Sequence, residues 1–169
     1  CRPRMAVGEL LEQSQRPDQA YESLSELAHI NPTALPLMAM PLAKLAITLH
    51  HETPTLALLE AAYEKNASLD VLQAIIALHA AKGETHPQQW YERHLQREPS
   101  LVAATQWLAD APSDTPAVKA NVHRALERAA KPLQRYRCAA CGFEATQHFW
   151  QCPGCQAWDS YPPRRVEEL

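Results

Sequence analysis

Residues 138–155 read CAACGFEATQHFWQCPGC and contain four of the five cysteines in a chain of 169 residues. The four cysteines form two C-x2-C pairs that are separated by ten residues. Two cysteines at this spacing can direct both sulfurs at one ion, and two such turns facing each other supply the four corners of a tetrahedron. We therefore predict that Cys138, Cys141, Cys152 and Cys155 bind one metal ion through their sulfurs.

Two other uses of paired cysteines, disulfide bonds and a redox pair, fit this stretch less well. Two disulfides would require an oxidising compartment, which nothing else in the sequence indicates, and would leave Cys1 unpaired. A thioredoxin-like redox pair would need an alternation of strands and helices around it, which is missing. Because four sulfurs already complete a tetrahedron, we expect His148, which lies between the pairs, to be a packing or surface residue rather than a ligand.

The sequence leaves the identity of the ion open between zinc and iron, because both accept four thiolates in a tetrahedron. The segments CAACG and CPGC resemble the metal-binding turns of rubredoxin, which holds a redox iron. Two departures weaken an electron-transfer function: the spacer is shorter, and Gln156 replaces the glycine after the last cysteine. A structural site is favoured, and electron transfer by a rubredoxin-type iron is the alternative.

Residues 134–169 are predicted to form a small β-rich domain around the ion. Its spacer is expected to include a β hairpin arm. Gly142 is predicted to take a positive φ that directs backbone amides at sulfur, and Pro153 and Gly154 are predicted to form the second tight turn in the same way. A domain of this size needs an apolar core beside its metal. The expected core is aromatic and consists of Phe143, Phe149, Trp150, Trp158 and Tyr161.

The remainder of the chain has the punctuation of paired helices. Pro17, Pro54, Pro87 and Pro116 each precede an amphipathic stretch, at intervals of 37, 33 and 29 residues. Proline suits the first position of a helix because the amide it lacks has no intrahelical partner there. The predicted helices lie near residues 3–14, 17–29, 37–50, 54–65, 68–82, 86–97, 100–110 and 116–130, with Pro41 in or near the first turns of the third.

A second set of marks has a similar period. Thr33, Ser68 and Ser100 each precede an apolar run and are predicted to be N-caps, whose hydroxyl accepts a hydrogen bond from a free amide of the first turn. A period of 32 to 37 residues is typical of helical-hairpin repeats.

The motif at residues 18–32 resembles a tetratricopeptide repeat. Ala20, Leu24, Leu27 and Pro32 match its small, large, small and proline positions, and Gly8 matches the glycine that lets its two helices pack closely. The predicted fold class is therefore mostly α: a tetratricopeptide-type helical-hairpin solenoid over residues 1–133, followed by the rubredoxin-like or zinc-ribbon domain over residues 134–169. The linker at residues 131–135 is too short for free tumbling, so we expect the ribbon to pack on the last helical pair.

Charge and motif content argue against other classes of protein. The net charge is −3, and residues 134–169 contain four basic and four acidic residues, without the basic surplus that nucleic-acid binding requires. No phosphate-binding glycine loop or catalytic triad pattern is present, so we do not expect an enzyme. The apolar stretch at residues 35–49 is short and contains two prolines, so this chain is expected to be soluble.

The combination of helical hairpins with YRCAACGFEATQHFWQCPGCQAWDSYPP at residues 136–163 is similar to the C-terminal part of the lipopolysaccharide assembly protein B family of Gram-negative bacteria. Apart from the cysteines, the matching residues include Tyr136, Arg137, Trp150, Trp158 and Pro162. In that family a membrane helix and further repeats precede this region, which would fit a chain that starts inside the protein. The resemblance maps the family's metal ligands onto the four cysteines named above.

The resemblance also implies a function and a location. It implies a non-catalytic adaptor on the cytoplasmic face of the inner membrane, held there by a segment outside this chain. The adaptor would promote proteolysis of the lipid A pathway deacetylase by the membrane-anchored AAA+ protease FtsH. The implied partners are therefore FtsH and proteins of lipopolysaccharide biosynthesis, and homo-oligomerisation is left open.

Overall fold

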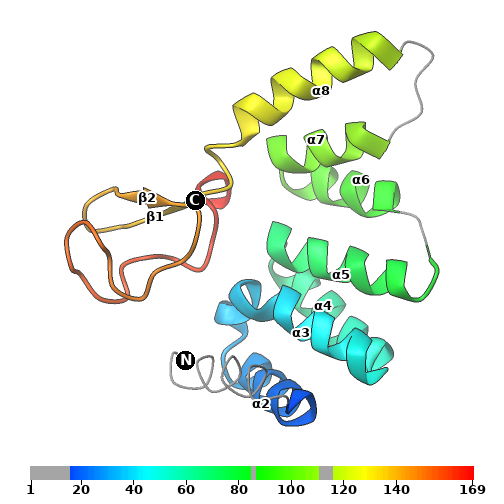
Figure 1. Ribbon diagram of the computed structural model, residues 1–169, viewed down its shortest axis with the longest axis vertical. Helices are drawn as coiled ribbons and strands as arrows, with labels where there is room; N and C mark the ends of the chain where they lie inside the picture. The colour runs from blue at the N-terminus through cyan, green and yellow to red at the C-terminus, as the bar shows by residue number, and fades with distance from the viewer. Residues whose placement is uncertain (1–15, 85–86, 111–115) are drawn as a thin grey trace. The chain divides into compact units, whose positions relative to one another are not determined.

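The computed structural model describes residues 16–84, 87–110 and 116–169, and most of these residues are helical (Figure 1). The described residues form seven α-helices: α2 (Pro17–Ile30), α3 (Leu35–Leu49), α4 (Glu52–Lys65), α5 (Leu69–Ala81), α6 (Pro87–Arg97), α7 (Leu101–Asp110) and α8 (Pro116–Ala130). They also form two short strands, β1 (Tyr136–Arg137) and β2 (Glu144–Ala145), and two 3-10 turns, η1 (Pro32–Ala34) and η2 (Val166–Glu168). The predicted fold class, mostly α with a small β-rich metal-binding module, is confirmed.

The helix boundaries lie within two residues of their predicted positions. Pro17, Pro87 and Pro116 each occupy the first position of a helix, as their lack of an amide proton favours. Pro54 lies instead at the third position, because α4 begins at Glu52. The predicted helix at residues 3–14, with Gly8, and also Cys1 lie outside the described residues.

The three predicted N-caps have different outcomes. Ser100 is an N-cap with the expected hydrogen bond, since the Ala103 amide donates to its Oγ at 2.9 Å. Ser68 is at the N-cap of α5, but its Oγ is buried and has no hydrogen-bond partner among the described residues. Thr33 is not a cap. It lies inside η1, where its hydroxyl donates to Asn31 Oδ1 at 2.6 Å.

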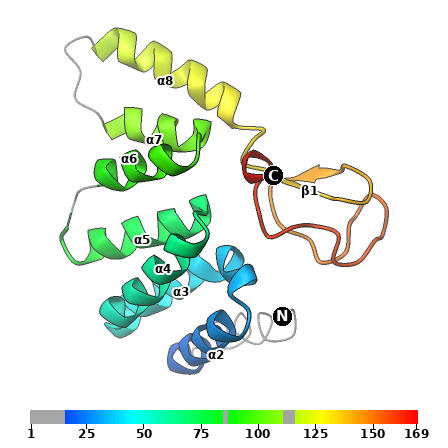
Figure 2. The same ribbon diagram turned by 180° about the vertical axis from the view of Figure 1, so that it is seen from behind.

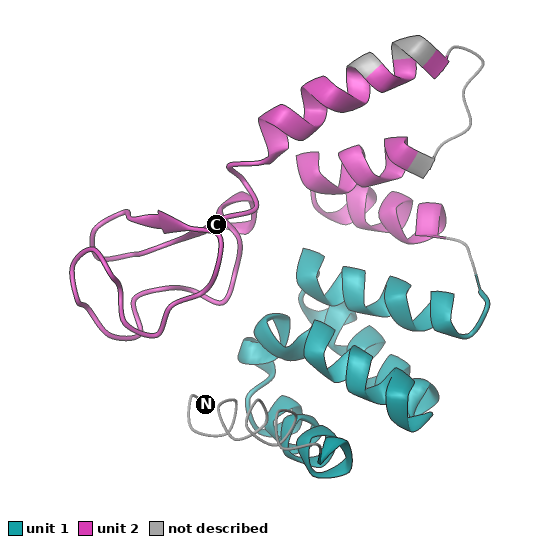
Figure 3. Ribbon diagram, in the orientation of Figure 1, with its two compact units in different colours: residues 1–85 teal, residues 86–169 magenta. Residues whose placement is uncertain are grey.

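The chain divides into two compact units, residues 1–85 and residues 86–169 (Figure 3). In the first unit, α3 contacts both α2 and α5, and α4 packs against α3 and α5 (Figures 1 and 2). This contact between α3 and α5, two helices apart in sequence, is typical of stacked helical hairpins. The core of the first unit is almost fully buried and includes Ala20, Met38, Leu42, Leu72 and Ile75.

Helix α3 together with η1 forms an 18-residue segment, Pro32–Leu49, that is long and apolar enough to cross a membrane. The helical run is thus longer than the sequence predicted, because it starts before residue 35. Half of this segment is buried inside the structure, against α2 and α5. Such burial is typical of a core helix.

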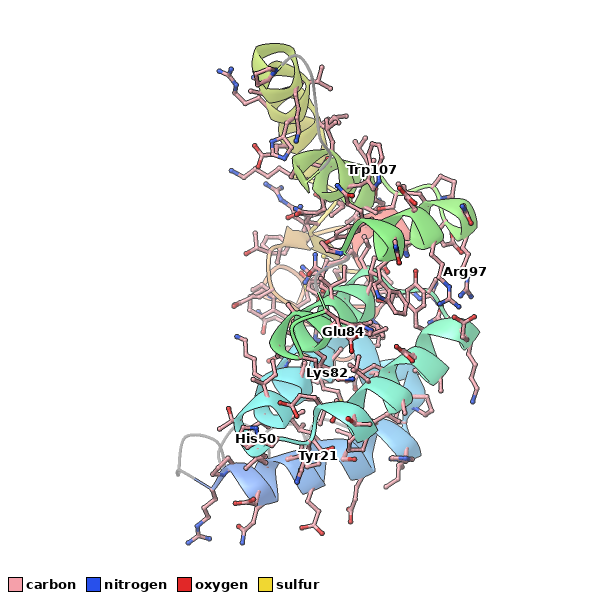
Figure 4. The ribbon with its side chains drawn as sticks, turned by 90° about the vertical axis from the view of Figure 1, so that its right-hand side faces the viewer. Tyr21, His50, Lys82, Glu84, Arg97 and Trp107 are labelled. Atoms are coloured by element: carbon pink, nitrogen blue, oxygen red, sulfur yellow. The ribbon has the colours of Figure 1, made fainter. Side chains whose placement is uncertain are left out.

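A cluster of polar contacts lies at the end of α5 in the first unit. His79 Nδ1 lies 2.7 Å from Glu84 Oε2, and His79 Nε2 lies 3.3 Å from Glu60 Oε1 on α4. Lys82 Nζ lies 3.4 Å from Glu84 Oε1 (both residues are labelled in Figure 4). The hydrogen bond from His79 and the charge of Lys82 lower the pKa of the Glu84 carboxyl.

In the second unit, α7 packs against both α6 and α8. Tyr91 and His94 of α6 and Val102 and Ala103 of α7 are buried. Trp107 Nε1 donates to Glu92 Oε1 at 3.1 Å and so joins α7 to α6 (Trp107 is labelled in Figure 4). The repeat pattern also predicts a hairpin made of α5 and α6. These two helices belong to different units, so this hairpin remains a prediction.

Replacement of Pro41 by alanine is expected to stabilise the first unit. Pro41 is exposed in the second turn of α3, where it removes the hydrogen bond to the carbonyl four residues earlier. Pro41→Ala should raise the free energy of unfolding by up to about 3 kcal/mol, measured by urea unfolding with circular dichroism. Pro17→Ala, at the first position of α2, is the control and should change it by less than about 0.5 kcal/mol. Equal effects of the two substitutions would contradict this account of α3.

Candidate metal centre

The first cysteine pair lies at the end of a short hairpin. Strands β1 and β2 pair antiparallel, with Arg137 opposite Glu144, and the pair is reinforced by an ion contact of 2.7 Å between Arg137 Nη2 and Glu144 Oε1. Beyond the strands, the Cys138 amide donates to Phe143 O at 3.0 Å, and the Gly142 amide donates to Cys138 O at 2.9 Å. These bonds close a tight turn that contains both cysteines.

The second pair repeats this construction. Gln151 and Trp158 form an antiparallel bridge, in the position that β1 and β2 occupy around the first pair. The Cys152 amide donates to Ala157 O, and the Gln156 amide donates to Cys152 O, both at 2.9 Å. Cys152 and Gln156 are therefore the structural counterparts of Cys138 and Gly142.

The four sulfurs converge on one point. The Sγ atoms of Cys138, Cys141, Cys152 and Cys155 all lie within 4.8 Å of one another. The Cys138–Cys155 distance is 3.9 Å and the Cys141–Cys152 distance is 3.7 Å. Metal–sulfur bonds of about 2.3 Å at tetrahedral angles require sulfur–sulfur separations of about 3.8 Å, so the cluster fits one tetrahedral zinc or iron ion.

The disulfide alternative does not fit these positions. A disulfide bond joins two sulfurs at about 2.05 Å, whereas all four cysteines of the cluster are free thiols here. Each pair contributes one buried and one exposed residue: Cys138 and Cys152 are buried, whereas Cys141 and Cys155 are exposed. One side of the cluster is therefore enclosed by protein and the other side faces outward.

The electrostatics of the cluster indicate a need for a cation. A hydrogen bond with Ser160, whose Oγ is 3.2 Å away, is the main cause that lowers the pKa of Cys138 to about 6, with help from the amides of Cys141 and Ala140. The amide of Phe143 lowers the pKa of Cys141, but the neighbouring thiols and burial outweigh it and raise that pKa to about 12. Four thiols this close do not all ionise near neutral pH unless positive charge is added. A divalent metal ion supplies that charge.

The two turns differ in how they reach the left-handed conformation. Gly142 has φ = +77° as predicted, but Gly154 does not have a positive φ. The second turn places the positive φ, 63°, at Gln156, the counterpart of Gly142. A Cβ at Gly154 would lie 3.2 Å from the Phe143 ring, a close contact that a shift of the ring by a few tenths of an ångström would relieve. The prediction of a left-handed glycine at 154 was therefore wrong.

The aromatic core of the module differs in part from the predicted set. Phe149, Trp150 and Tyr161 are in it, but Phe143 and Trp158 are 44% and 59% exposed. Two further members of the core are Tyr136, which is 5% exposed, and His148. The ring centre of His148 lies 5.5 Å from that of Tyr136, 4.8 Å from that of Trp150 and 6.0 Å from that of Tyr161.

His148 is a packing residue, as expected, and does not belong to the sulfur cluster. Its Nε2 lies 3.1 Å from the carbonyl oxygen of Tyr161. Burial lowers the pKa of the ring, although the Tyr161 carbonyl and the charge of Asp159 oppose this effect. A mostly neutral ring accords with its place among aromatic side chains.

The C-terminal tail runs back along the linker that precedes β1. The Val166 amide donates to Arg135 O at 2.7 Å, and the Glu167 amide donates to Leu133 O at 3.2 Å. The Arg165 guanidinium lies 4.3 Å from the centre of the Tyr136 ring, close enough for a cation–π contact. The tail is thus joined to both the linker and the aromatic core.

The same tail reaches the N-terminus of α7. Glu167 accepts hydrogen bonds from the amides of Leu101 and Val102 and, at 3.0 Å, from the hydroxyl of Ser100. A carboxylate at this position satisfies free amides and complements the positive end of the helix dipole. Helix α7 has no acidic residue of its own in its first turn. Glu167 therefore links the metal module to the helical part of the second unit.

Sequence reasoning had no assignment for Glu167. The available signals were an N-cap serine at 100 followed by an uncharged first turn, and two glutamates near the end of the chain. These signals are 67 residues apart, and only the fold brings them together.

Comparison with known proteins gives the same assignment for the four-cysteine module. The family described as the rubredoxin metal binding domain of lipopolysaccharide assembly protein B matches residues 136–163. The lipopolysaccharide assembly protein B of Escherichia coli K12 is 30% identical over 118 residues, which are 63% of this chain and 29% of that protein. The protein of the same name from Haemophilus influenzae is 32% identical over 47 residues, 28% of this chain and 12% of that protein. The chain thus spans less than a third of the length of the relatives it matches.

The left-handed conformation at residue 142 gives a testable difference between the two turns. Nothing lies within 4 Å of a Cβ at this position, so the cost of Gly142→Ala comes only from holding an alanine at a positive φ. It should lower the free energy of unfolding by about 1 kcal/mol, measured by chemical denaturation with metal bound. Gln156→Ala places the same residue in the same conformation at the counterpart position, but there it replaces a side chain that already has a Cβ. It should change stability by less than about 0.5 kcal/mol, and the idea fails if both substitutions are neutral.

Proposed function

We propose that this chain, which belongs to the lipopolysaccharide assembly protein B family, is a non-catalytic adaptor in which a metal-stabilised module holds a set of partner-binding helical hairpins. The supporting observation is the pairing of two features in the second unit. Four sulfurs gather around one point, and the tail of the same module caps α7 through Glu167. A fold of this kind transmits the order of the metal site to the helices.

In this proposal, Cys138, Cys141, Cys152 and Cys155 are the ligands of one zinc or iron ion. Four protein ligands fill a tetrahedral site and leave no open position for a substrate or water, which is typical of structural sites. When bound, the ion supplies folding free energy to a module too small to be stable on its aromatic core alone. The chain's own residues hold the sulfurs in place through the turn amides and Ser160.

The helices at residues 1–133 are proposed to form the partner-binding domain, and residues 134–169 the metal-binding domain. Helical-hairpin repeats bury their apolar faces against neighbouring repeats and present extended surfaces to other proteins. The contact of α3 with both α2 and α5 supports this arrangement for the first unit.

The proposed partners follow from the family. The intact protein would lie on the cytoplasmic face of the inner membrane, held by a segment outside this chain. There it would promote proteolysis of the lipid A pathway deacetylase by the protease FtsH and so regulate lipopolysaccharide biosynthesis. Homo-oligomerisation is compatible with such an adaptor.

Electron transfer by a rubredoxin-type iron is the second candidate, favoured by the exposure of Cys141 and Cys155. Iron in the cluster would give a visible thiolate-to-iron absorption band and a reversible potential in protein purified without added metal. Colourless protein with one zinc per chain would argue for the structural function.

Loss of one sulfur ligand is expected to release the ion and to unfold the module. Cys152→Ser should reduce bound metal from one ion per chain to less than about 0.1, measured by elemental analysis, and should lower the melting temperature of the second unit. Cys1→Ser, at the fifth cysteine of the sequence, is the control and should leave metal content and melting temperature unchanged. A Cys152→Ser protein that keeps a full metal complement would disprove the ligand assignment.

The adaptor function itself is tested by affinity capture from detergent-solubilised bacterial membranes. The wild-type chain should retain FtsH or a lipopolysaccharide biosynthesis protein, and Cys152→Ser should lose it. Capture of neither class of protein by the wild-type chain would contradict the proposal.

Removal of the Glu167 charge should weaken the cap of α7 without affecting the metal. Glu167→Gln is expected to destabilise the second unit by about 1 kcal/mol and to speed hydrogen exchange at the amides of Leu101 and Val102. Glu168→Gln removes the neighbouring carboxylate, which accepts a hydrogen bond from the Arg165 amide, and serves as the control. The metal content of both variants should remain at the wild-type level. Unchanged exchange at Leu101 and Val102 in Glu167→Gln would show that the carboxylate does not cap the helix.

A further inference from the structure

A groove of about 880 Å³ lies in the second unit, between α7 and the C-terminal half of α8. We call it the α8 groove and define it by three basic residues on its rim, Arg124, Arg128 and Lys131, and by Thr105 and Ala130 on its floor. The rim residues are exposed, whereas Thr105 and Ala130 are 3% and 1% exposed. The groove therefore has a charged rim and a floor of small side chains.

Arg124 and Arg128 lie on one face of α8, and Lys131 follows directly after its last residue. They are spaced by four and three residues, so they lie along one line that spans about 10 Å at 1.5 Å per residue. Arg128 and Lys131 make no ion pair within the described part of the chain. One carboxylate, Glu127, also lines the groove, and His123 Nδ1 lies 3.7 Å from its Oε2. Three cations against one carboxylate leave a net charge of +2.

Polar neutral groups complete the lining. The side-chain amides of Gln106, on α7, and Gln134, on the linker, border the groove and can bond a peptide backbone. The hydroxyl of Thr105 is already used, since it donates to Leu101 O at 2.8 Å. A bound segment can therefore approach the floor closely, and the Thr105 hydroxyl does not compete for the hydrogen bonds of that segment.

We infer that the α8 groove docks an acidic segment of a partner protein, with small apolar residues facing the floor and carboxylates facing the rim. The inference rests on the adaptor function proposed above and specifies the chemistry of one partner segment. Guanidinium groups match carboxylates in bidentate geometry, which favours Arg128 as a contact. A line of cations suits carboxylates spaced along a peptide.

Two other anionic ligands fit less well. A flat membrane surface does not reach the buried floor formed by Thr105 and Ala130. Nucleic acid would require a wider basic surface, but the chain as a whole has a net charge of −3.

Basic residues at the C-terminal end of a helix also stabilise its dipole, which gives them a role without any ligand. Lys65 occupies the same place on α4, in the last turn and exposed, and does not line the groove. Reversal of its charge therefore reproduces the dipole effect and leaves the groove intact. It is the matched control for charge reversal at Arg128.

The test uses the whole metal-loaded chain and a fluorescein-labelled synthetic peptide of twelve residues in which glutamates alternate with alanines. Fluorescence anisotropy at low salt should show saturable binding, and a peptide with glutamine in place of glutamate should bind at least tenfold more weakly. Arg128→Glu alone should weaken binding several-fold, and Arg128→Glu combined with Lys131→Glu about tenfold or more, whereas the single control Lys65→Glu should change it less than twofold. Raising the salt concentration should weaken binding, because exposed charges are screened.

Equal binding of the two peptides, or equal effects of the groove and control variants, would overturn the inference. The inference would also be overturned if inorganic phosphate or phosphatidylglycerol vesicles bound more tightly than the peptide and the groove substitutions abolished that binding. Membrane capture separates this inference from the adaptor proposal. If the wild-type chain and the double groove variant capture the same proteins equally, the groove inference fails and the adaptor proposal stands.

Discussion

The mutual repulsion of four ionised sulfurs within 4.8 Å is the constraint on which the four-cysteine module depends. The local backbone eases this repulsion by directing amides at the sulfurs in both turns, but it does not remove it, as the opposite pKa shifts of Cys138 and Cys141 show. A cation at the centre converts the repulsion into attraction, so that the charge that would separate the turns instead holds them together. The small aromatic core, the tail and its contact with α7 are all built around turns fixed in this way.

Order at the sulfur cluster passes to the helices through the chain's last residues. The tail bonds the linker at Leu133 and Arg135, and Glu167 then bonds the first turn of α7. The carboxylate provides what α7 lacks in its own sequence, a negative charge beside its free amides. In the second unit, which contains α6, α7 and α8, the N-terminus of α7 is therefore completed by a distant part of the chain.

The elements that sequence predicted well are those governed by local chemistry. The period of prolines located the helices, and the spacing of the cysteines located the cluster, because a C-x2-C turn and a proline-started helix are each decided within a few residues. The errors concern single side chains whose hydrogen bonds differ from those expected. Ser68 occupies an N-cap position, yet its hydroxyl does not bond a first-turn amide, and Thr33 lies inside η1, where its hydroxyl bonds Asn31 instead. Glu167 could not be assigned, since its partners are 66 and 65 residues away in sequence.

The uneven enclosure of the sulfurs affects how the ion is exchanged. Each turn places its first cysteine inside the fold and its second at the surface. An ion would therefore enter or leave on the exposed side, past Cys141 and Cys155, whereas Cys138 and Cys152 lie beside Ser160 and Tyr161. Because the module depends on its ion for stability, exchange for a different thiophilic metal would have to be completed from this side before the two turns separate.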